Sequence, residues 1–232
     1  ALLTIVQPGM EGGNAFADVV SGKVNPSGKL TDTWAYKYED YPNAETFSHN
    51  NGNVETEVYE EGMYVGYRYF DTFDVPVRYI YVGYRYFESA AKSKVLYPFG
   101  FGLSYTDFEI NDYCLESLEN KKMTVSVQVK NTGKVSGKEV VQVYTSLPGG
   151  ILEKEAHRLV AYAKTSELKP DESEKITVEI SLEHLTSYDE KRAAWILESG
   201  FYGIWIGNSL ADAKLCGGVK LDNEVIFRQV KN

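Results

Sequence analysis

The chain has 232 residues, of which 43% are hydrophobic and 25% are charged, so it carries enough apolar side chains to bury a core. Its net charge of −9 argues against a nucleic-acid partner, because such a partner requires a basic surface. No apolar run reaches the roughly 18 residues of a membrane-spanning helix, and the first residues lack the basic start of a secretory signal. We therefore expect a globular protein with no nucleic-acid and no membrane partner.

The first 36 residues predict part of an α/β unit. The run LLTIV at 2–6 is short, continuous and partly β-branched, which indicates a buried strand. The segment NAFADVVSG at 14–22 predicts a helix that Asn14 caps and Gly22 ends. The NPSG turn and the short strand KLTDTW complete a strand–loop–helix–turn–strand order, which is half of an α/β unit.

Such a half unit buries too little surface to fold alone. Its apolar side chains should therefore stay exposed in the isolated chain and promote self-association. We expect this exposed apolar surface at the following residues: Leu2, Leu3, Ile5, Val6, Phe16 and Val20.

Residues 37–105 predict a connector that is rich in aromatic rings. Ten tyrosines and five phenylalanines lie between residues 59 and 105, and their spacing has no helical period. We favour a connector that packs its rings against neighbouring domains over a sugar-stacking platform, because a platform needs only a few exposed rings. The heptapeptide YVGYRYF occurs at 64–70 and again at 81–87, which indicates a local duplication in which one copy forms an extra loop or hairpin.

From residue 106 onward, short segments alternate apolar and polar residues at even spacing. Seven or eight such strands, separated by turn signals such as NTG, LPGG and KPDES, are typical of an immunoglobulin-like or fibronectin type III-like β-sandwich. Val125, Val127 and Val129 should face its core, and the tail DNEVIFRQVKN should add an edge strand. The predicted fold is mainly β, with these parts in chain order: a partial α/β unit at 1–36, the connector at 37–105 and the sandwich at 106–232.

The cysteine and histidine residues indicate no metal centre. Cys114 and Cys216 form no metal-binding motif, and we expect two free thiols in a reducing compartment, which favours the cytoplasm; one disulfide across the β-domain is the alternative. His49, His157 and His184 lie far apart in the sequence and show no ligand spacing, so we expect no zinc site.

Four blocks of the sequence together resemble one known family. They are QPGMEGGNAFADVVSGKVNPSGKLTDTW at 7–34, YEEGMYVGYRYF at 59–70, YPFGFGLSYTDF at 97–108 and VKNTGKVSGKEVVQVY at 129–144. In these blocks the chain resembles the C-terminal part of glycoside hydrolase family 3, the β-glucosidase and β-xylosidase family, and most closely its bacterial members. The resemblance implies a parent protein with a (β/α)₈ barrel, an α/β sandwich domain and a fibronectin type III-like domain.

The resemblance also implies a retaining reaction that two carboxyl groups carry without metal or organic cofactor. The family's nucleophile is an Asp in the barrel, and its acid/base is typically a Glu on a loop that precedes the block matching 7–34. Neither maps onto this chain. We therefore expect an inactive C-terminal fragment of a retaining β-glycosidase that hydrolyses terminal β-linked sugars. Its partners would be the missing barrel and sandwich segments and, in the whole enzyme, a β-glucoside or oligosaccharide substrate.

No catalytic residue is assigned, and three residues are candidates for supporting the substrate pocket. Glu11 lies in a Gly-flanked loop between the predicted strand and helix, and in the family it belongs to the supporting shell. Arg68 and Arg85 lie one in each YVGYRYF copy, where a structural salt bridge or stacking on a ring is the simpler role. The alternative function for the whole chain is a non-catalytic carbohydrate-binding or interaction module.

Overall fold

The computed structural model describes residues 2–40, 44–45, 52, 55, 95–152 and 154–230. Its helical segments are α1 (Gly12–Val20) and the 3-10 turns η1 (Tyr38–Asp40) and η4 (Leu182–Leu185). Its strands are β1 (Trp34–Ala35), β2 (Val95–Tyr97), β3 (Phe108–Glu119), β4 (Lys122–Asn131), β5 (Val140–Ser146), β6 (Arg158–Lys164), β7 (Ser173–Ser181), β8 (Ser187–Asp189), β9 (Ala194–Leu197), β10 (Gly200–Gly207), β11 (Lys214–Leu221) and β12 (Val225–Gln229).

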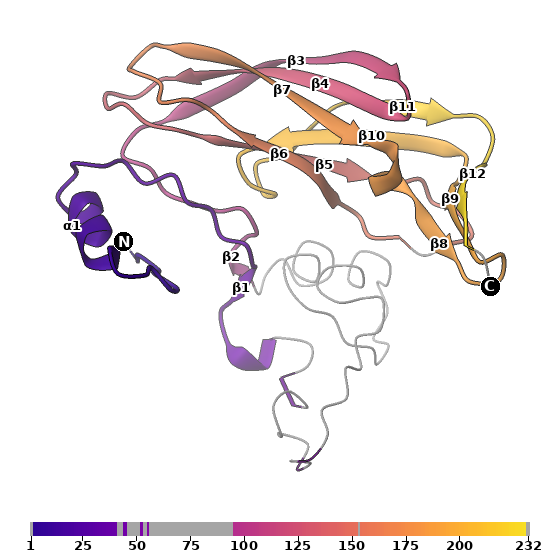
Figure 1. The fold of residues 1–232 in the computed structure, drawn as a ribbon, viewed down its shortest axis with the longest axis horizontal. Coiled ribbons are helices and arrows are strands. Elements are labelled where there is room, and N and C mark those ends of the chain that lie inside the picture. The colour runs from indigo at the N-terminus through magenta and orange to yellow at the C-terminus, as the bar shows by residue number, and fades with distance from the viewer. Residues whose placement is uncertain are drawn as a thin grey trace.

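Two antiparallel sheets form a β-sandwich, as the alternating sequence pattern predicts. One sheet has the strand order β11-β10-β5-β6 and the other has the order β3-β4-β7. A small third sheet, β12-β9-β8, lies at one end of the sandwich (Figure 1). The β1–β2 pair lies below the sandwich in this view, and α1 lies near its opposite end. The predicted edge strand in the C-terminal tail is confirmed, because β12 pairs with β9.

The inner faces of the two large sheets supply the main hydrophobic core. Val125, Val127 and Val129 are at most 3% exposed and pack with the inward residues of the facing sheet, so the predicted alternation in β4 is confirmed. Val141 and Val143 of β5 are fully buried opposite them. The alternation of β-branched and polar residues therefore determines which face of β4 packs on the core.

A second, smaller core covers the outer face of the β5–β10 region. Tyr144 and Leu210 are buried there, and the neighbouring side chains that pack on them include Phe99 from the aromatic connector. Gly100 holds this contact close, since its φ of +77° is in the left-handed region and a Cβ would lie 2.1 Å from Oε1 of Gln142. The Gln142 amide in turn donates to the carbonyl oxygens of Gly100 and Asn208.

The N-terminal segment corrects two of the sequence predictions. Residues 2–6 form no strand and are exposed, because no strand in the described ranges pairs with them and a single strand cannot satisfy its own backbone groups. Asn14 is not the helix cap: α1 begins at Gly12 with Glu11 in the capping position, and the Asn14 amide donates to the Glu11 carboxylate. The predicted end at Gly22 is confirmed, since Gly22 adopts a φ of +77° directly after the helix.

The second predicted strand is shorter than expected. Of KLTDTW only Trp34 lies in a strand, and Trp34 and Ala35 form β1. Leu30 still exchanges two backbone hydrogen bonds with Gly100 and Phe101, so this segment runs alongside the connector. The predicted apolar surface is present: the exposed residues include Leu2, Leu3, Ile5, Val6, Phe16 and Val20.

Edge strand β3 is interrupted twice along its pairing with β4. The register shifts between Asn111 and Cys114 and again between Leu115 and Ser117, and Asp112 adopts a φ of +51°. Leu115 and Leu118 of this strand are exposed. These interruptions are β-bulges, which bend an edge strand and increase its twist.

Asn131 at the end of β4 satisfies its whole side chain inside the protein. Its amide nitrogen donates to the carbonyl oxygens of Val135 and Leu168, and its Oδ1 accepts from the Thr106 hydroxyl and the Gly133 N–H. Because the residue is completely buried, no water can replace a lost partner.

We predict that Asn131→Asp destabilises the protein by about 3 kcal/mol, because a carboxylate oxygen would face the two carbonyl oxygens that the amide now serves. Urea unfolding followed by circular dichroism measures this loss. The exposed Asn223→Asp is the matched control and should change the free energy of unfolding by less than about 0.5 kcal/mol. Equal effects of the two substitutions would contradict the prediction.

Candidate functional site

The structure describes one of the three residues that the sequence singled out as pocket supports. Glu11 lies at the exposed start of α1, where its carboxylate accepts a hydrogen bond of 2.6 Å from Asn14. Arg68 and Arg85, with both YVGYRYF copies, lie outside the described residues. The role of these three residues in a substrate pocket stays a prediction.

Four carboxylates are buried among the described residues, and each is paired with a basic side chain. The pairs are Glu139 with Lys29, Glu155 with Arg158, Asp189 with Arg192, and Glu198 with Lys154. A nucleophile or general acid needs an oxygen that can reach a substrate. These oxygens are occupied by cations and N–H groups of the fold, so the four residues are structural.

The Lys29–Glu139 pair joins the N-terminal segment to the sandwich. The Lys29 ammonium lies 2.8 Å from the Glu139 carboxylate, and the two side chains are only 13% and 7% exposed. The same carboxylate accepts hydrogen bonds from the Val140 N–H and the Asn208 amide. Separating the Lys29 ammonium from the Glu139 carboxylate would leave a buried charge without a partner, which is strongly unfavourable. The pair therefore holds the two segments together.

Asn25 makes the second connection at this junction. Its Oδ1 accepts hydrogen bonds of 2.9 Å from the Ser104 hydroxyl and the Tyr105 N–H, and its amide donates to the Ser136 carbonyl oxygen. A Cβ on Gly137 would lie 2.4 Å from the Asn25 nitrogen, so only glycine allows this close approach. The NPSGK segment, residues 25–29, is therefore the part of the chain that docks on the sandwich.

Three of the four motif blocks meet at this junction. Asn25 and Lys29 belong to the block at 7–34, Ser104 and Tyr105 to the block at 97–108, and Glu139 to the block at 129–144. The fourth block, at 59–70, lies outside the described residues. The motifs that carry the family resemblance thus encode contacts between parts of the chain that are distant in sequence.

A second cluster holds the long loop between β5 and β6. The Glu198 carboxylate accepts hydrogen bonds from the N–H groups of Ile151 and Leu152 and from the Lys154 ammonium. Burial, with the Glu198 charge as a second cause, raises the pKa of Tyr202 to about 12, so this hydroxyl stays protonated and donates to the Glu198 carbonyl oxygen. Glu198 therefore holds the middle of the loop by its backbone, while the Ile151 side chain is 94% exposed.

A third cluster joins the β8–β9 turn to the turn between β11 and β12. The Arg192 guanidinium donates to both oxygens of Glu224, at 2.5 and 3.0 Å, and also to Asp189. Hydrogen bonds from Arg192 lower the pKa of Asp189 and of Glu224 below their ordinary values. The same hydrogen bonds raise the pKa of Arg192.

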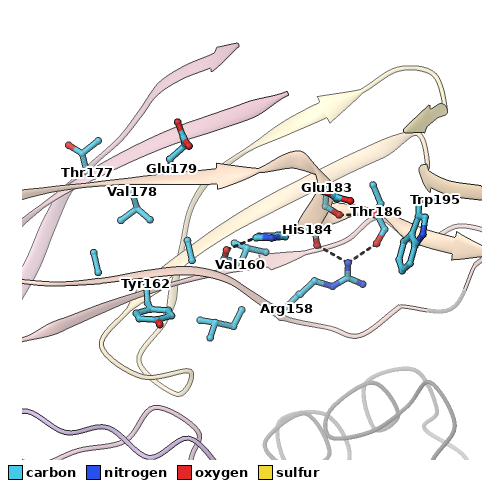
Figure 2. Close-up of a pocket in the computed structure, with 13 residues that line it drawn as sticks. Arg158, Val160, Tyr162, Thr177, Val178, Glu179, Glu183, His184, Thr186 and Trp195 are labelled. Carbon is cyan, nitrogen blue, oxygen red and sulfur yellow. Dashed lines mark hydrogen bonds between the residues drawn. The ribbon is translucent and has the colours of Figure 1, made fainter. Parts of the chain in front are cut away.

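A groove of about 710 Å³ lies between the edge strands β6 and β7. These two strands belong to different sheets, and their inward residues Val160 and Val178 form part of its floor. Figure 2 shows polar and aromatic side chains from β6, β7, η4 and β9 around it, among them His184 and Trp195. The sequence analysis did not find this groove, because the edges of two sheets become neighbours only in the folded protein.

Metal-binding and membrane features complete the description. Both Cys114 and Cys216 are free thiols. Within the described ranges, no group of three His, Cys, Asp or Glu side chains could hold a metal ion. In that same part of the chain, no helix combines the length and apolar character that crossing a membrane requires.

The fold and its junction define a fibronectin type III-like β-sandwich joined to an α/β segment. Residues 139–210 match the fibronectin type III-like domain, and residues 1–67 match the glycosyl hydrolase family 3 C-terminal domain. The chain belongs to glycoside hydrolase family 3 and corresponds to its C-terminal part.

Curated relatives match the whole chain. It is 42% identical to β-glucosidase A of Butyrivibrio fibrisolvens and 38% identical to a β-glucosidase of Ruminococcus albus, in both cases over 100% of this chain. The match spans 28% and 22% of those two relatives, so the chain covers about a quarter of their length. Fungal relatives also match, for example β-glucosidase B of Emericella nidulans at 36% identity over 88% of this chain and 23% of the relative.

Solved structures show the same arrangement of this segment. The β-glucosidase 3B of Thermotoga neapolitana in complex with glucose is similar with a TM-score of 0.77 at 37% identity, over 94% of this chain and 28% of that protein. The β-glucosidase of Kluyveromyces marxianus in complex with glucose gives a TM-score of 0.77 at 32% identity, over 95% of this chain and 24% of that protein.

The residues that the sequence analysis missed had a signal that could have identified them. Lys29, Asn25 and Glu139 all lie inside the motif blocks that carry the family resemblance. The partner of each residue, however, lies more than seventy positions away in the sequence. The pairing itself was therefore not predictable from spacing.

We predict that Lys29→Met destabilises the protein by about 3 kcal/mol, because it leaves the buried Glu139 carboxylate without its cation. Thermal unfolding measures the loss, and limited proteolysis should show faster cleavage before residue 40. The control Lys23→Met removes an exposed pair with Asp18 and should cost less than about 0.5 kcal/mol. A stability loss in Lys29→Met no larger than in this control would refute the structural role of the junction.

We also predict that the stabilising effect of Arg192 depends on pH. Because the pKa values of Asp189 and Glu224 are lowered in the folded state, their contribution is present above the ordinary carboxyl range near pH ~4 and is lost as the pH falls below it. The melting temperature of Arg192→Met should therefore differ most from that of the natural chain near neutral pH, and the difference should shrink in acid. Lys220→Met, which removes an exposed pair with Asp222, should show a small and constant difference.

Proposed function

We propose that the chain is the structural C-terminal part of a retaining β-glycosidase of the β-glucosidase type, and that both catalytic carboxyl groups lie outside its 232 residues. The observation that carries this proposal is the match of the entire chain to proteins named β-glucosidase, of which it spans about a quarter. The pairing of every described buried carboxylate with a cation supports it as well.

The proposed reaction is hydrolysis of a terminal β-linked sugar. A carboxylate nucleophile would form a glycosyl-enzyme, and a carboxylic acid would protonate the leaving oxygen and then activate water. Two carboxyl groups roughly 5 Å apart carry both steps, so the proposal requires neither metal nor organic cofactor. The natural substrate would be a β-glucoside or short oligosaccharide.

In this proposal the chain contributes rigidity rather than chemistry. Residues 1–36 would complete an α/β sandwich domain, residues 37–105 would connect, and residues 106–232 would brace the enzyme. The junction at Lys29 and Asn25 would hold the α/β part in a fixed position, with Glu11 in its supporting loop. Catalysis needs such support, because a displacement of about 1 Å at the reacting groups can reduce the rate by roughly two orders of magnitude. Arg68 and Arg85 would add structural support from the connector.

The proposal predicts that the purified chain does not hydrolyse an aryl β-glucoside. A chimera in which this chain replaces the matching segment of the Butyrivibrio fibrisolvens relative should be active, because all of the chain aligns with that segment at 42% identity. Release of the coloured aryl alcohol measures both activities.

Two controls make the outcome decisive. The same relative without the segment should be inactive, and a chimera carrying Lys29→Met should lose activity together with thermal stability. Robust turnover by the 232-residue chain alone, abolished by replacing one of its own acidic residues, would overturn the proposal.

A further inference from the structure

The outer face of the sheet β11-β10-β5-β6 carries an apolar stripe on β10 and β11. Alternate residues of β10 point into the main core, which leaves Phe201, Gly203 and Trp205 on the outer face. Leu215 of β11 pairs with Trp205 and belongs to the same face. The side chains of Phe201 and Leu215 are 50% and 51% exposed. We call Phe201, Trp205 and Leu215 the outer stripe.

Glycines keep this part of the sheet flat. A Cβ on Gly218 would lie 2.3 Å from Cζ of the Phe201 ring, and a Cβ on Gly203 would lie 3.0 Å from Cδ1 of Leu215. Phe201 and Leu215 therefore lie directly over backbone that has no side chain of its own. The result is a flat apolar surface, on which planar rings pack closely.

The aromatic connector already covers the surface next to the outer stripe. Phe99 packs in the smaller core, and its carbonyl oxygen accepts a hydrogen bond of 3.2 Å from the Leu210 N–H. Trp205 packs against the same core, so the exposed end of the stripe is continuous with the surface that Phe99 covers. Further rings of the same connector are therefore the occupant that this surface favours.

The second YVGYRYF copy, residues 81–87, is tethered close to the outer stripe. It ends eight residues before Val95, so its last residue lies within roughly 28 Å of the start of β2. The β1–β2 pair lies below this sheet in Figure 1, and Phe99 follows Val95 by four residues. Only β10 separates β11 from β5, a distance of about 10 Å across the sheet. The whole stripe is therefore within reach of the second copy.

The two copies also differ in their relation to the family. The match to the family's C-terminal domain, residues 1–67, ends inside the first copy, whereas neither matched range contains the second copy. In an extended conformation Val82, Tyr84 and Tyr86 would lie on one side of the second copy, and Arg85 would lie on the other. One side would then be aromatic and free of charge, which suits the outer stripe.

We propose that the second YVGYRYF copy docks on the outer stripe through the side that carries Tyr84 and Tyr86. The second copy, which lies outside the described residues, thereby extends the cover that Phe99 begins over the outer face of the sandwich. The first copy has another position, in the α/β part of the chain. The docking concerns contacts within this chain alone, so it goes beyond the proposed function and does not depend on it.

Limited digestion of the full chain with trypsin tests the docking, because the copies place Arg68 and Arg85 in the same heptapeptide. Without docking the local sequence gives both arginines similar susceptibility, whereas a docked segment is cleaved only after it opens. We expect Leu215→Ser to speed cleavage after Arg85 by roughly tenfold, the effect of losing about one apolar contact, and to leave cleavage after Arg68 unchanged. Mass spectrometry of the early fragments measures both rates.

A matched control and a second variant complete the experiment. Leu118→Ser replaces a leucine that is 46% exposed on the edge strand of the other sheet, and it should change neither rate. Phe201→Ser should act like Leu215→Ser, and since both side chains are half exposed, neither substitution removes a residue of the main core.

Three results would overturn the proposal. The first is a rate of cleavage after Arg85 that Leu215→Ser and Phe201→Ser leave unchanged. The second is an equal increase after Arg68 and Arg85, which would mean that the substitutions loosen the chain as a whole. The third is protection of Arg85 that disappears on dilution, which would mean that a second copy of the protein covers the stripe. Activity of the chimera enters none of these measurements, so the proposed function is tested separately.

Discussion

The Lys29–Glu139 ion pair is the contact on which the arrangement of this chain depends. It lies in residues 25–29, a segment that hydrogen bonds and an ion pair fasten to the sandwich. Two charges so far removed from water are stable only as a pair, and the Glu139 carboxylate of this pair also needs its hydrogen bonds from the Val140 N–H and the Asn208 amide. Beside it, Asn25 depends on Ser136 and Gly137 for its contact with the sandwich. Three separated blocks of the sequence, at 7–34, 97–108 and 129–144, thus supply the residues of one junction.

The β-sandwich was predictable because its information is local. In β4 the alternation of Val125, Val127 and Val129 with polar residues specifies both the strand and its inward face, and the turn residues mark the ends. The strand predicted at 2–6 failed for the opposite reason: its apolar residues specify burial against a partner that the described chain does not supply. Asn14 failed as a cap because the helix already begins at Gly12, with Glu11 in the capping position, and the Asn14 amide instead donates to the Glu11 carboxylate. The junction could not be predicted, because Lys29 and Glu139 are 110 positions apart and spacing carries no information about such pairs.

Charged side chains hold loops or turns in place at three points of this sandwich. Glu198 holds the β5–β6 loop, Arg158 holds η4, and Arg192 holds the turn before β9. Loops have few apolar contacts, and their backbone N–H and C=O groups need hydrogen-bond partners. These charged side chains supply such partners. Of the three, the connection from Arg158 to η4 lies beside the groove between β6 and β7.

The two bulges in β3 have a consequence for the behaviour of the chain in concentrated solution. This strand ends its sheet, is long, and exposes Leu115 and Leu118, a combination that would ordinarily invite another molecule to continue the sheet. At Asp112 the backbone adopts a φ of +51°. This bend means that the unpaired N–H and C=O groups along the free edge of β3 do not form a straight row. A neighbouring molecule therefore meets no straight template, which disfavours the edge-to-edge pairing by which fibrils grow.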